Sequence, residues 1–353
     1  MNKKIPSKFN LVLGAGNFGT CLAQHLASKG EKVVIWGRSE EVIRSINEEH
    51  RNCRYLSDVA LSPNVTATCD LSHDLIHQAD SIILAIPTQY LRGILSKLKP
   101  YPVKLPLLVC SVKGIEDKTY MLPIQIIGDV LGEAVANQTV ILSGPSFAIE
   151  VIRQLPTSVS VGSWSKPAAI GAQELFHTNY FRAYTSDDPI GLEVAGALKN
   201  VIAIAAGACH GLGLQQNAQA ALLTRGLAEM TRVGVALGAN PLTFIGLGGV
   251  GDLFLTCTST KSRNFSLGYH LGQGASVEEA LARLGSVAEG FYTAKASYKL
   301  SQKLGTDTPI IDQVYAVLYG GKRLEQAVQD LMSRAMKPEV TLPETAPANN
   351  QDS

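Results

Sequence analysis

The sequence predicts an α/β fold, in which a doubly wound parallel sheet is followed by an all-helical domain. Short apolar runs alternate with helix-like segments through the first half of the chain, and strand-like runs disappear after Ser186. The first apolar run also leads directly into a glycine-rich turn. Apolar strands that alternate with helices are typical of a parallel sheet covered by helices on both faces.

The expected elements of the sheet domain follow one another at short intervals. Continuous apolar runs predict strands at 10–14, 32–36, 81–86, 106–112 and 139–142, and weaker runs extend the sheet at 157–161 and 181–184. Helical patterns lie between the strands at 18–28, 40–47, 89–98 and 122–131. Strand and helix therefore alternate in the order that parallel strands require.

The second half is expected to be helical. Asp188 followed by Pro189 is a typical helix start, because an acidic cap accepts hydrogen bonds from the first turn and proline fits its backbone. Helical patterns follow at 190–208, 218–237, 277–284, 294–304 and 324–332. The last residues are polar and contain several prolines, which predicts a disordered tail. We therefore expect a sheet domain at 1–188, a helical domain at 189–335 and a tail at 336–353.

The composition excludes several classes of protein. The 353 residues suggest two domains, and a hydrophobic share of 46% rules out wholesale disorder. A formal net charge of +1 gives no basic excess for binding nucleic acid. We expect neither a secretory signal nor a transmembrane helix, because the apolar runs are too short. The six cysteines form no C-x-x-C pair, which predicts reduced thiols and a cytoplasmic location.

A glycine fingerprint for dinucleotide binding lies between the first expected strand and the first expected helix. Gly14, Gly16 and Gly19 form a G-x-G-x-x-G pattern. The first glycine allows the tight turn, the second lets the backbone approach a pyrophosphate, and the third allows close helix packing. Free N–H groups at the helix N-terminus then face the phosphates. We therefore interpret the sheet domain as a Rossmann domain that binds NADP or NAD.

Arg38 indicates which of the two cofactors is favoured. It follows the second expected strand, where NAD-selective enzymes usually carry an acid that binds the ribose 2′-hydroxyl. A guanidinium group can instead pair with a 2′-phosphate and stack on the adenine. Arg38 therefore favours NADP, although the use of NAD stays open.

Lys199 is the strongest candidate for a chemical role. It lies within the expected helix 190–208, which is apolar nearly all the way round and should be buried. Burial lowers the pKa of a lysine and suits it to proton transfer near neutral pH. A lysine at a helix edge that extends its ammonium group to water explains the periodicity equally well. Both interpretations stay open at this point.

Other polar segments could complete a pocket. Lys113-Gly114 and the segment 143–147 each follow an expected strand, at the sheet edge where open α/β folds bind ligands. The loop 259–264 is rich in donors, but a solvated loop is the simpler interpretation. A second G-x-G-x-x-G pattern at 246–251 has no strand before it, so we do not interpret it as a dinucleotide fingerprint. No metal-binding motif is found.

Together these motifs resemble those of bacterial NAD(P)-dependent glycerol-3-phosphate dehydrogenases, over about residues 9–331. The shared motifs are GAGNFG at 14–19, VKG at 112–114, SGPSFA at 143–148, LKN at 198–200, GGVGDL at 248–253, SRN at 262–264 and VAEG at 287–290. The resemblance implies a Rossmann domain and a helical domain with the active site between them. It implies reversible reduction of dihydroxyacetone phosphate to sn-glycerol 3-phosphate with NADPH or NADH, which supplies glycerophospholipid synthesis.

The resemblance also implies individual roles. It makes Lys199 the general acid/base, which Asp252 could hold in place. The implied substrate contacts are Lys113, Gly144, Ser146, Asp252, Ser262, Arg263 and Asn264. Beside the glycines Gly14, Gly16 and Gly19, the implied cofactor contacts are Asn17, Phe18, Arg38, Lys113, Ala148, Arg263, Val287 and Glu289. The expected partner is a small phosphorylated substrate, without nucleic acid, metal or stable membrane insertion. The apolar helical half could carry a homodimer interface.

Two alternatives remain. A reductase of similar architecture could act on a hydroxy acid or a sugar acid, and would need a carboxylate site in place of a phosphate site. A dinucleotide sensor without catalysis would bind NADPH but would leave Lys199, Asp252 and Arg263 unexplained. A substrate panel with NADPH separates these alternatives.

Overall fold

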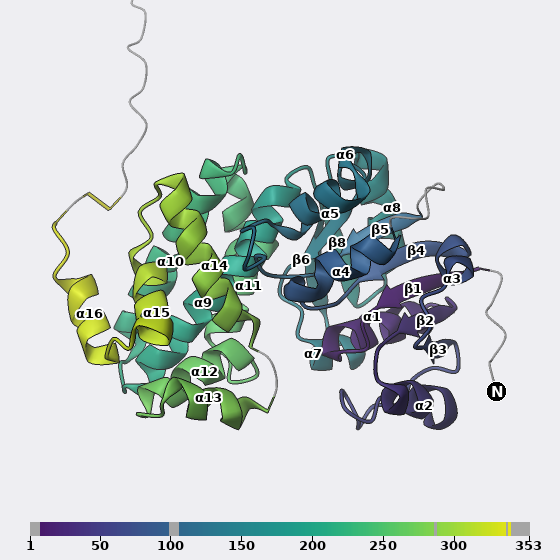
Figure 1. Cartoon of the computed structure of the whole chain (residues 1–353), viewed down its shortest axis with the longest axis horizontal. Helices are drawn as coiled ribbons and strands as arrows, with labels where there is room; N and C mark the ends of the chain where they lie inside the picture. Colours follow the sequence, from purple (N-terminus) through teal and green to yellow (C-terminus); the bar gives the residue numbers. More distant parts are fainter. Residues whose placement is uncertain (1–7, 99–105, 286–287, 337, 340–353) are drawn as a thin grey trace, which may run out of the picture.

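A single eight-stranded sheet organises the first lobe of the molecule (Figure 1). The computed structural model describes residues 8–98, 106–285, 288–336 and 338–339. The strand order is β3-β2-β1-β4-β5-β6-β7-β8, and only the β6/β7 pair is antiparallel. The strands are β1 (Phe9–Leu13), β2 (Val33–Trp36), β3 (Val65–Thr68), β4 (Ala79–Leu84), β5 (Leu107–Cys110), β6 (Val140–Ser143), β7 (Thr157–Gly162) and β8 (Phe181–Ser186).

Helices cover both faces of the sheet, which confirms the doubly wound prediction. Alternate residues of β1 point into different cores: Leu11 and Leu13 into one, Val12 into the other. The first core includes residues of α3 (His73–His77), α4 (Thr88–Leu98), α5 (Pro123–Leu131) and α6 (Glu133–Ala136). The second includes residues of α1 (Asn17–Ser28), α2 (Glu40–Glu49), α7 (Ala148–Ile152) and α8 (Lys166–Phe176).

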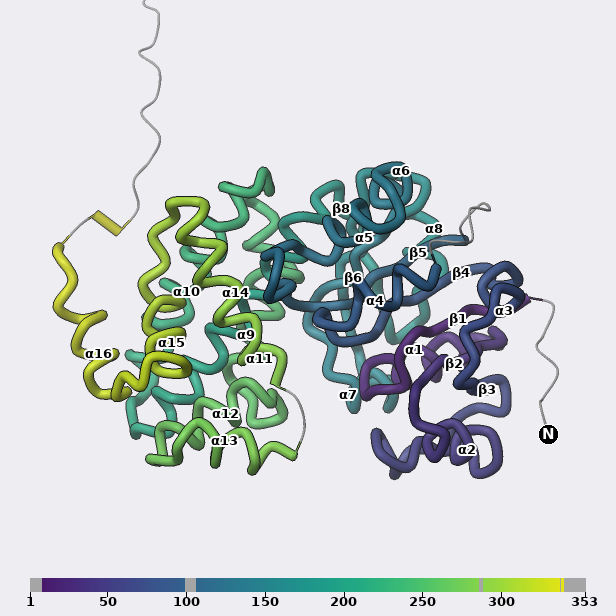
Figure 2. Tube along the Cα trace, viewed as in Figure 1, coloured from purple at the N-terminus to yellow at the C-terminus, as the bar shows by residue number. Residues whose placement is uncertain are grey.

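The second lobe is helical and is built around α9 (Pro189–Gly211), as Figure 2 shows. The other helices are α10 (Gln216–Ala236), η1 (Pro241–Ile245), η2 (Leu247–Gly251), α11 (Asp252–Cys257), α12 (Arg263–Gly272), α13 (Val277–Leu284), α14 (Glu289–Leu304), α15 (Pro309–Gly320) and α16 (Leu324–Met332). Within the described residues, α9 alone is long and apolar enough to cross a membrane, but 89% of its most apolar window is buried inside the protein. This burial is typical of a core helix.

Glycines bring α9 and α12 into backbone contact, and we call this contact the glycine seam. A Cβ atom added at Gly207 would lie 1.9 Å from the Phe265 carbonyl oxygen, and one at Gly268 would lie 1.9 Å from the Ile204 carbonyl oxygen. Both distances are far inside van der Waals contact, so only glycine fits at these positions. The seam therefore fixes the first half of α12 against the last turns of α9.

Several elements were absent from the sequence prediction or differ from it. The strand β3 alternates buried and half-exposed residues and so lacks a continuous apolar run. The helices that were not predicted are α3, α6, α7, α8, η1, η2, α11, α12 and α15. The prediction of a loop at 259–264 is wrong for its last two residues. Arg263 and Asn264 form the first turn of α12, and Ser262 caps that helix. Most of the expected tail, at 337 and 340–353, lies outside the described residues.

Candidate active site

A single carboxylate joins two lysines where the two lobes meet. Asp252 Oδ1 accepts a hydrogen bond of 2.5 Å from Lys199 Nζ, and Oδ2 accepts one of 2.7 Å from Lys113 Nζ. Lys113 follows β5 in the sheet lobe, whereas Lys199 lies on α9 and Asp252 begins α11 in the helical lobe. Thr256 Oγ1 accepts a further bond of 3.0 Å from Lys199 Nζ. The residues form one cluster across the boundary.

The charges of the cluster change its proton affinities. Burial lowers the pKa of Lys199 to about 8, with Asp252 opposing and Lys113 reinforcing the change. Burial alone would raise the pKa of Asp252, but the two ammonium groups outweigh it and hold that pKa below its usual value. Lys199 is therefore poised to exchange a proton near neutral pH beside a carboxylate whose own pKa is lowered.

Glycines pack closely beside this cluster. Gly196 lies one turn before Lys199 on α9, and a Cβ atom there would lie 3.3 Å from Ser143 Oγ, which is tighter than ordinary van der Waals contact. In η2, a Cβ atom at Gly248 of the second glycine pattern would lie 2.4 Å from Leu192 Cδ2, and one at the neighbouring Gly249 would lie 2.0 Å from the Phe244 carbonyl oxygen. These close contacts shape the turn that precedes Asp252 and give Gly248 a packing role without a dinucleotide.

The first turn of α12 lies beside the cluster and carries Ser262, Arg263 and Asn264. Ser262 Oγ accepts a 3.2 Å bond from the Phe265 N–H, and Asn264 Oδ1 accepts a 3.0 Å bond from the Gly290 N–H at the start of α14. Burial raises the pKa of Glu289 on α14, while Arg263, Lys113 and Lys199 oppose the rise. The structure thus brings Glu289 into the electrostatic reach of all three cations. Val287 lies outside the described residues.

The expected cofactor contacts line a different part of the sheet edge. Gly14, Gly16 and Gly19 lie between β1 and the first turn of α1, which also carries Asn17 and Phe18. Ala148 begins α7, which packs against α1. Gly144 and Ser146 follow β6, and Ser146 Oγ donates a 2.9 Å bond to the Gly144 carbonyl oxygen.

Arg38 has a partner that the sequence did not reveal. Its guanidinium carbon lies 4.7 Å from the centre of the Tyr90 ring, and Tyr90 is 51% exposed. Tyr90 belongs to α4, which follows β4, so the pair spans the edge on which the glycine fingerprint lies. Such a stacked pair offers a flat cationic surface to an adenine and its phosphate.

Two buried hydroxyl groups at the same edge have no hydrogen-bond partner among the described residues. They belong to Ser143 and Thr88. A buried polar group without a partner costs free energy, so such atoms point to a bound ligand or water. Within the described residues no group of His, Cys, Asp or Glu could hold a metal ion.

Family models and similar proteins identify the family of the chain. The model described as NAD-dependent glycerol-3-phosphate dehydrogenase N-terminus matches residues 11–169, and the model of its C-terminus matches residues 188–329. The chain is 46% identical over 329 residues to glycerol-3-phosphate dehydrogenase [NAD(P)+] from Carboxydothermus hydrogenoformans. The match covers 93% of this chain and 97% of that protein.

The corresponding protein from Limosilactobacillus reuteri is 44% identical over 331 residues, with coverage of 93% and 98%. The chain belongs to the NAD-dependent glycerol-3-phosphate dehydrogenase family. A crystal structure of glycerol-3-phosphate dehydrogenase from Coxiella burnetii superposes with a TM-score of 0.87 at 36% identity, and covers 93% of this chain and 100% of that one. The D-mandelate dehydrogenase bound to NADH, at 16% identity and a TM-score of 0.57, shares the fold alone.

The sequence of this glycerol-3-phosphate dehydrogenase family member did not lead us to predict two residues of the site. Thr256 lies four positions after Asp252, on the same face of α11, so helical spacing could have found it once that helix was predicted. Tyr90 carried no comparable signal, because only the folded chain brings it to Arg38.

Proposed function

We propose that the protein catalyses the reversible reduction of dihydroxyacetone phosphate to sn-glycerol 3-phosphate with NADPH or NADH. The observation that carries the proposal is the buried cluster in which Asp252 joins Lys199 and Lys113. Reduction of a ketone develops negative charge on the carbonyl oxygen, and a positioned ammonium group stabilises that charge and supplies the proton. The family to which the chain belongs supports the choice of substrate.

The residues of the fingerprint fit a dinucleotide. Gly14 has a φ of 126°, and a Cβ atom there would lie 2.3 Å from the Ala85 carbonyl oxygen. A Cβ atom at Gly16 would meet no atom within 4 Å, which leaves its face open to a pyrophosphate. Arg38 and Tyr90 would hold the adenosine end. When bound, the reduced nicotinamide supplies a hydride to the ketone carbon.

The protein's own groups perform the proton transfer. Lys199 Nζ donates its proton to the substrate oxygen during reduction and takes it back during oxidation. Asp252 and Thr256 hold that nitrogen through hydrogen bonds of 2.5 and 3.0 Å. Arg263 and the free N–H groups at the start of α12 bind the substrate phosphate, and Asn264 is aligned by its bond to Gly290.

The proposed further substrate contacts are Gly144, Ser146, Ser262 and Lys113. The proposed further cofactor contacts are Ala148, Val287 and Glu289.

The proposal extends to the cellular role and organisation of the protein. We propose that it supplies glycerophospholipid synthesis, lies in the cytoplasm and forms a homodimer. We also propose that its two domains divide at residue 188. The six cysteines are free, which favours a reducing compartment.

A substrate panel tests the proposal. We expect NADPH to be consumed with dihydroxyacetone phosphate, and very slowly with dihydroxyacetone or with short 2-keto acids. Faster turnover of a keto acid than of dihydroxyacetone phosphate would indicate that the site binds a carboxylate and not a phosphate. NADPH binding without turnover of any of these compounds would favour a dinucleotide sensor.

A further inference from the structure

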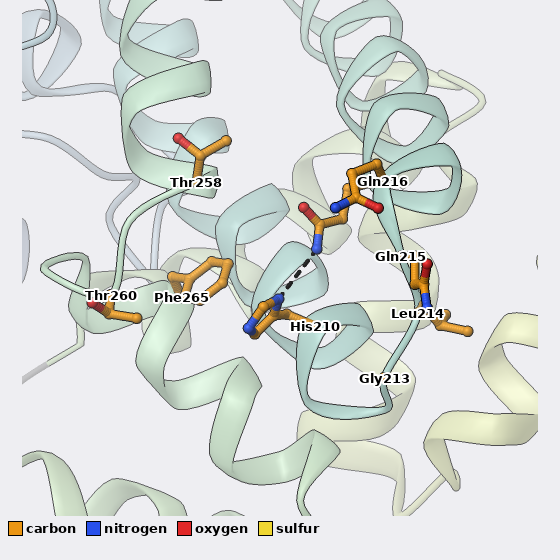
Figure 3. A pocket seen from close by; sticks show the side chains of 9 residues that line it. His210, Gly213, Leu214, Gln215, Gln216, Thr258, Thr260 and Phe265 are labelled. Atoms are coloured by element: carbon orange, nitrogen blue, oxygen red, sulfur yellow. Dashed lines mark hydrogen bonds between the residues drawn. The ribbon is translucent and has the colours of Figure 1, made fainter.

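A cavity of about 340 Å³ opens in the helical lobe, away from the lysine cluster (Figure 3). It lies between the end of α9, the start of α10 and the segment that joins α11 to α12. Its polar walls come mainly from Gln215, Gln216, Gln219, Thr258 and Thr260, and we call it the glutamine pocket. His210 is eleven residues after Lys199 on α9, so the pocket lies about 16 Å along the helix from that lysine.

The glutamine pocket carries little charge. Among the described residues that line it there is no Asp, Glu, Lys or Arg. The side-chain amides of Gln215 and Gln216 are exposed and make no hydrogen bond to any described residue. Gln219 Nε2 lies 3.3 Å from His210 Nδ1, the bond drawn dashed in Figure 3. Phe265 also lines the pocket, with 4% of its surface exposed.

We propose that the glutamine pocket binds a neutral polyhydroxylated compound of about the size of a monosaccharide or cyclic polyol. Each amide offers a donor and an acceptor, which matches hydroxyl groups that also do both. A charged ligand would lose its hydration without meeting an opposite charge, which is unfavourable. The cavity volume lies at the lower end of the range for small-molecule sites.

The pocket touches the segment that leads into α12. Thr258 and Thr260 belong to this segment, and Ser266 Oγ donates a 3.0 Å bond to the Thr260 carbonyl oxygen. Two residues further on, Ser262 caps the helix whose first turn carries Arg263. A compound bound to Thr258 and Thr260 would therefore bias the position of the phosphate contacts. This regulatory part rests on the proposed function, whereas binding itself does not.

The test is ligand-observed saturation-transfer NMR with D-glucose and myo-inositol as neutral probes, and glucuronate and glucosamine as charged ones. We expect saturable binding of a neutral probe, weakened about tenfold or more by the double variant Gln215→Leu/Gln219→Leu, which removes two amides from the wall. The matched control is Gln302→Leu/Gln329→Leu, because both residues are exposed glutamines that lie outside the pocket. The control should bind the probe as the unchanged protein does.

Three binding results would overturn the proposal: no saturable binding of either neutral probe, equal binding by the pocket variant and the control, or tighter binding of a charged probe. For the regulatory part, the bound probe should change the Michaelis constant for dihydroxyacetone phosphate in the control and not in the pocket variant. Binding with no change in that constant would refute regulation alone. Binding is measured without turnover, so its failure is distinct from failure of the proposed function.

Discussion

Lys113 of the sheet lobe and Asp252 of the helical lobe form a 2.7 Å ion pair across the boundary between the lobes. The other oxygen of the same carboxylate holds Lys199. The same side chain therefore holds the proposed acid/base and links the two lobes. Its burial means that loss of the charge leaves two cations facing each other in a site with little water.

Asp252→Asn is expected to lower kcat about a hundredfold and to destabilise the protein by about 3–5 kcal/mol. The carboxylate raises the pKa of Lys199, so its removal lowers that pKa further below about 8. The alkaline fall in the rate of reduction should move to lower pH. Glu41→Gln is the control, because it removes an exposed ion pair with Arg54 and should change neither quantity. An unchanged pH profile in Asp252→Asn would show that this carboxylate does not set the pKa of Lys199.

Lys199→Ala is expected to reduce turnover by about 10²–10⁴-fold and to leave NADPH binding intact, because the lysine is proposed to move the proton and not to hold the cofactor. In the unchanged protein the ammonium form is the donor. The rate of reduction should therefore fall as pH rises through about 8, and the rate of oxidation should rise there. Steady-state rates and a fluorescence titration with NADPH check both parts. Activity within a few fold of the unchanged protein would place the proton donor elsewhere.

Arg38→Ala is expected to weaken the binding of NADPH more than tenfold and to change the binding of NADH much less. A charge-assisted bond to the 2′-phosphate contributes about 1.5–3 kcal/mol, and only NADPH carries that group. Tyr90→Ala is the comparison, because the ring stacks on Arg38 and should affect both cofactors through the adenine. Equal losses for both cofactors in Arg38→Ala would remove the basis for a preference for NADP.

Arg263→Ala is expected to raise the Michaelis constant for dihydroxyacetone phosphate strongly, because it removes a bidentate phosphate contact. Some loss of NADPH affinity is compatible with its place near Glu289. Dihydroxyacetone, which lacks the phosphate, should be a poor substrate of both proteins. If the variant lost activity toward both compounds by the same factor, Arg263 would not bind the phosphate.

Glu229→Gln should flatten the dependence of stability on pH. Glu229 on α10 accepts bonds from the N–H groups of Ile310 and Ile311, and burial raises its pKa to about 7. The folded protein then holds a proton that the unfolded chain releases above pH about 4.5, so stability falls as pH rises from about 4.5 to 7, by at most about 3 kcal/mol. Denaturant unfolding at several pH values measures the slope. A slope that persists in the variant would assign the effect to another group.

Patterns within single segments predicted the sheet lobe well. Continuous apolar runs marked five of the eight strands, weaker runs marked two more, and the glycine fingerprint placed the turn before α1. The pattern could not find β3, whose alternation of buried and half-exposed residues carries no apolar run. It also misread the start of α12, because Arg263 and Asn264 look like loop residues until Ser262 is recognised as a cap. Periodicity left Lys199 undecided, since only folding brings Asp252, a distant residue in sequence, to its ammonium group.

The glycine seam has a consequence for the proposed substrate contacts. Gly207 and Gly268 let main chain touch main chain, so the spacing between the last turns of α9 and the body of α12 does not depend on side-chain rotamers. Lys199 lies about two turns before Gly207 on α9, and Arg263 lies five residues before Gly268 on α12. A larger residue at either glycine would push the two helices apart. It would thereby change the relative placement of the two residues that are proposed to meet the substrate oxygen and its phosphate.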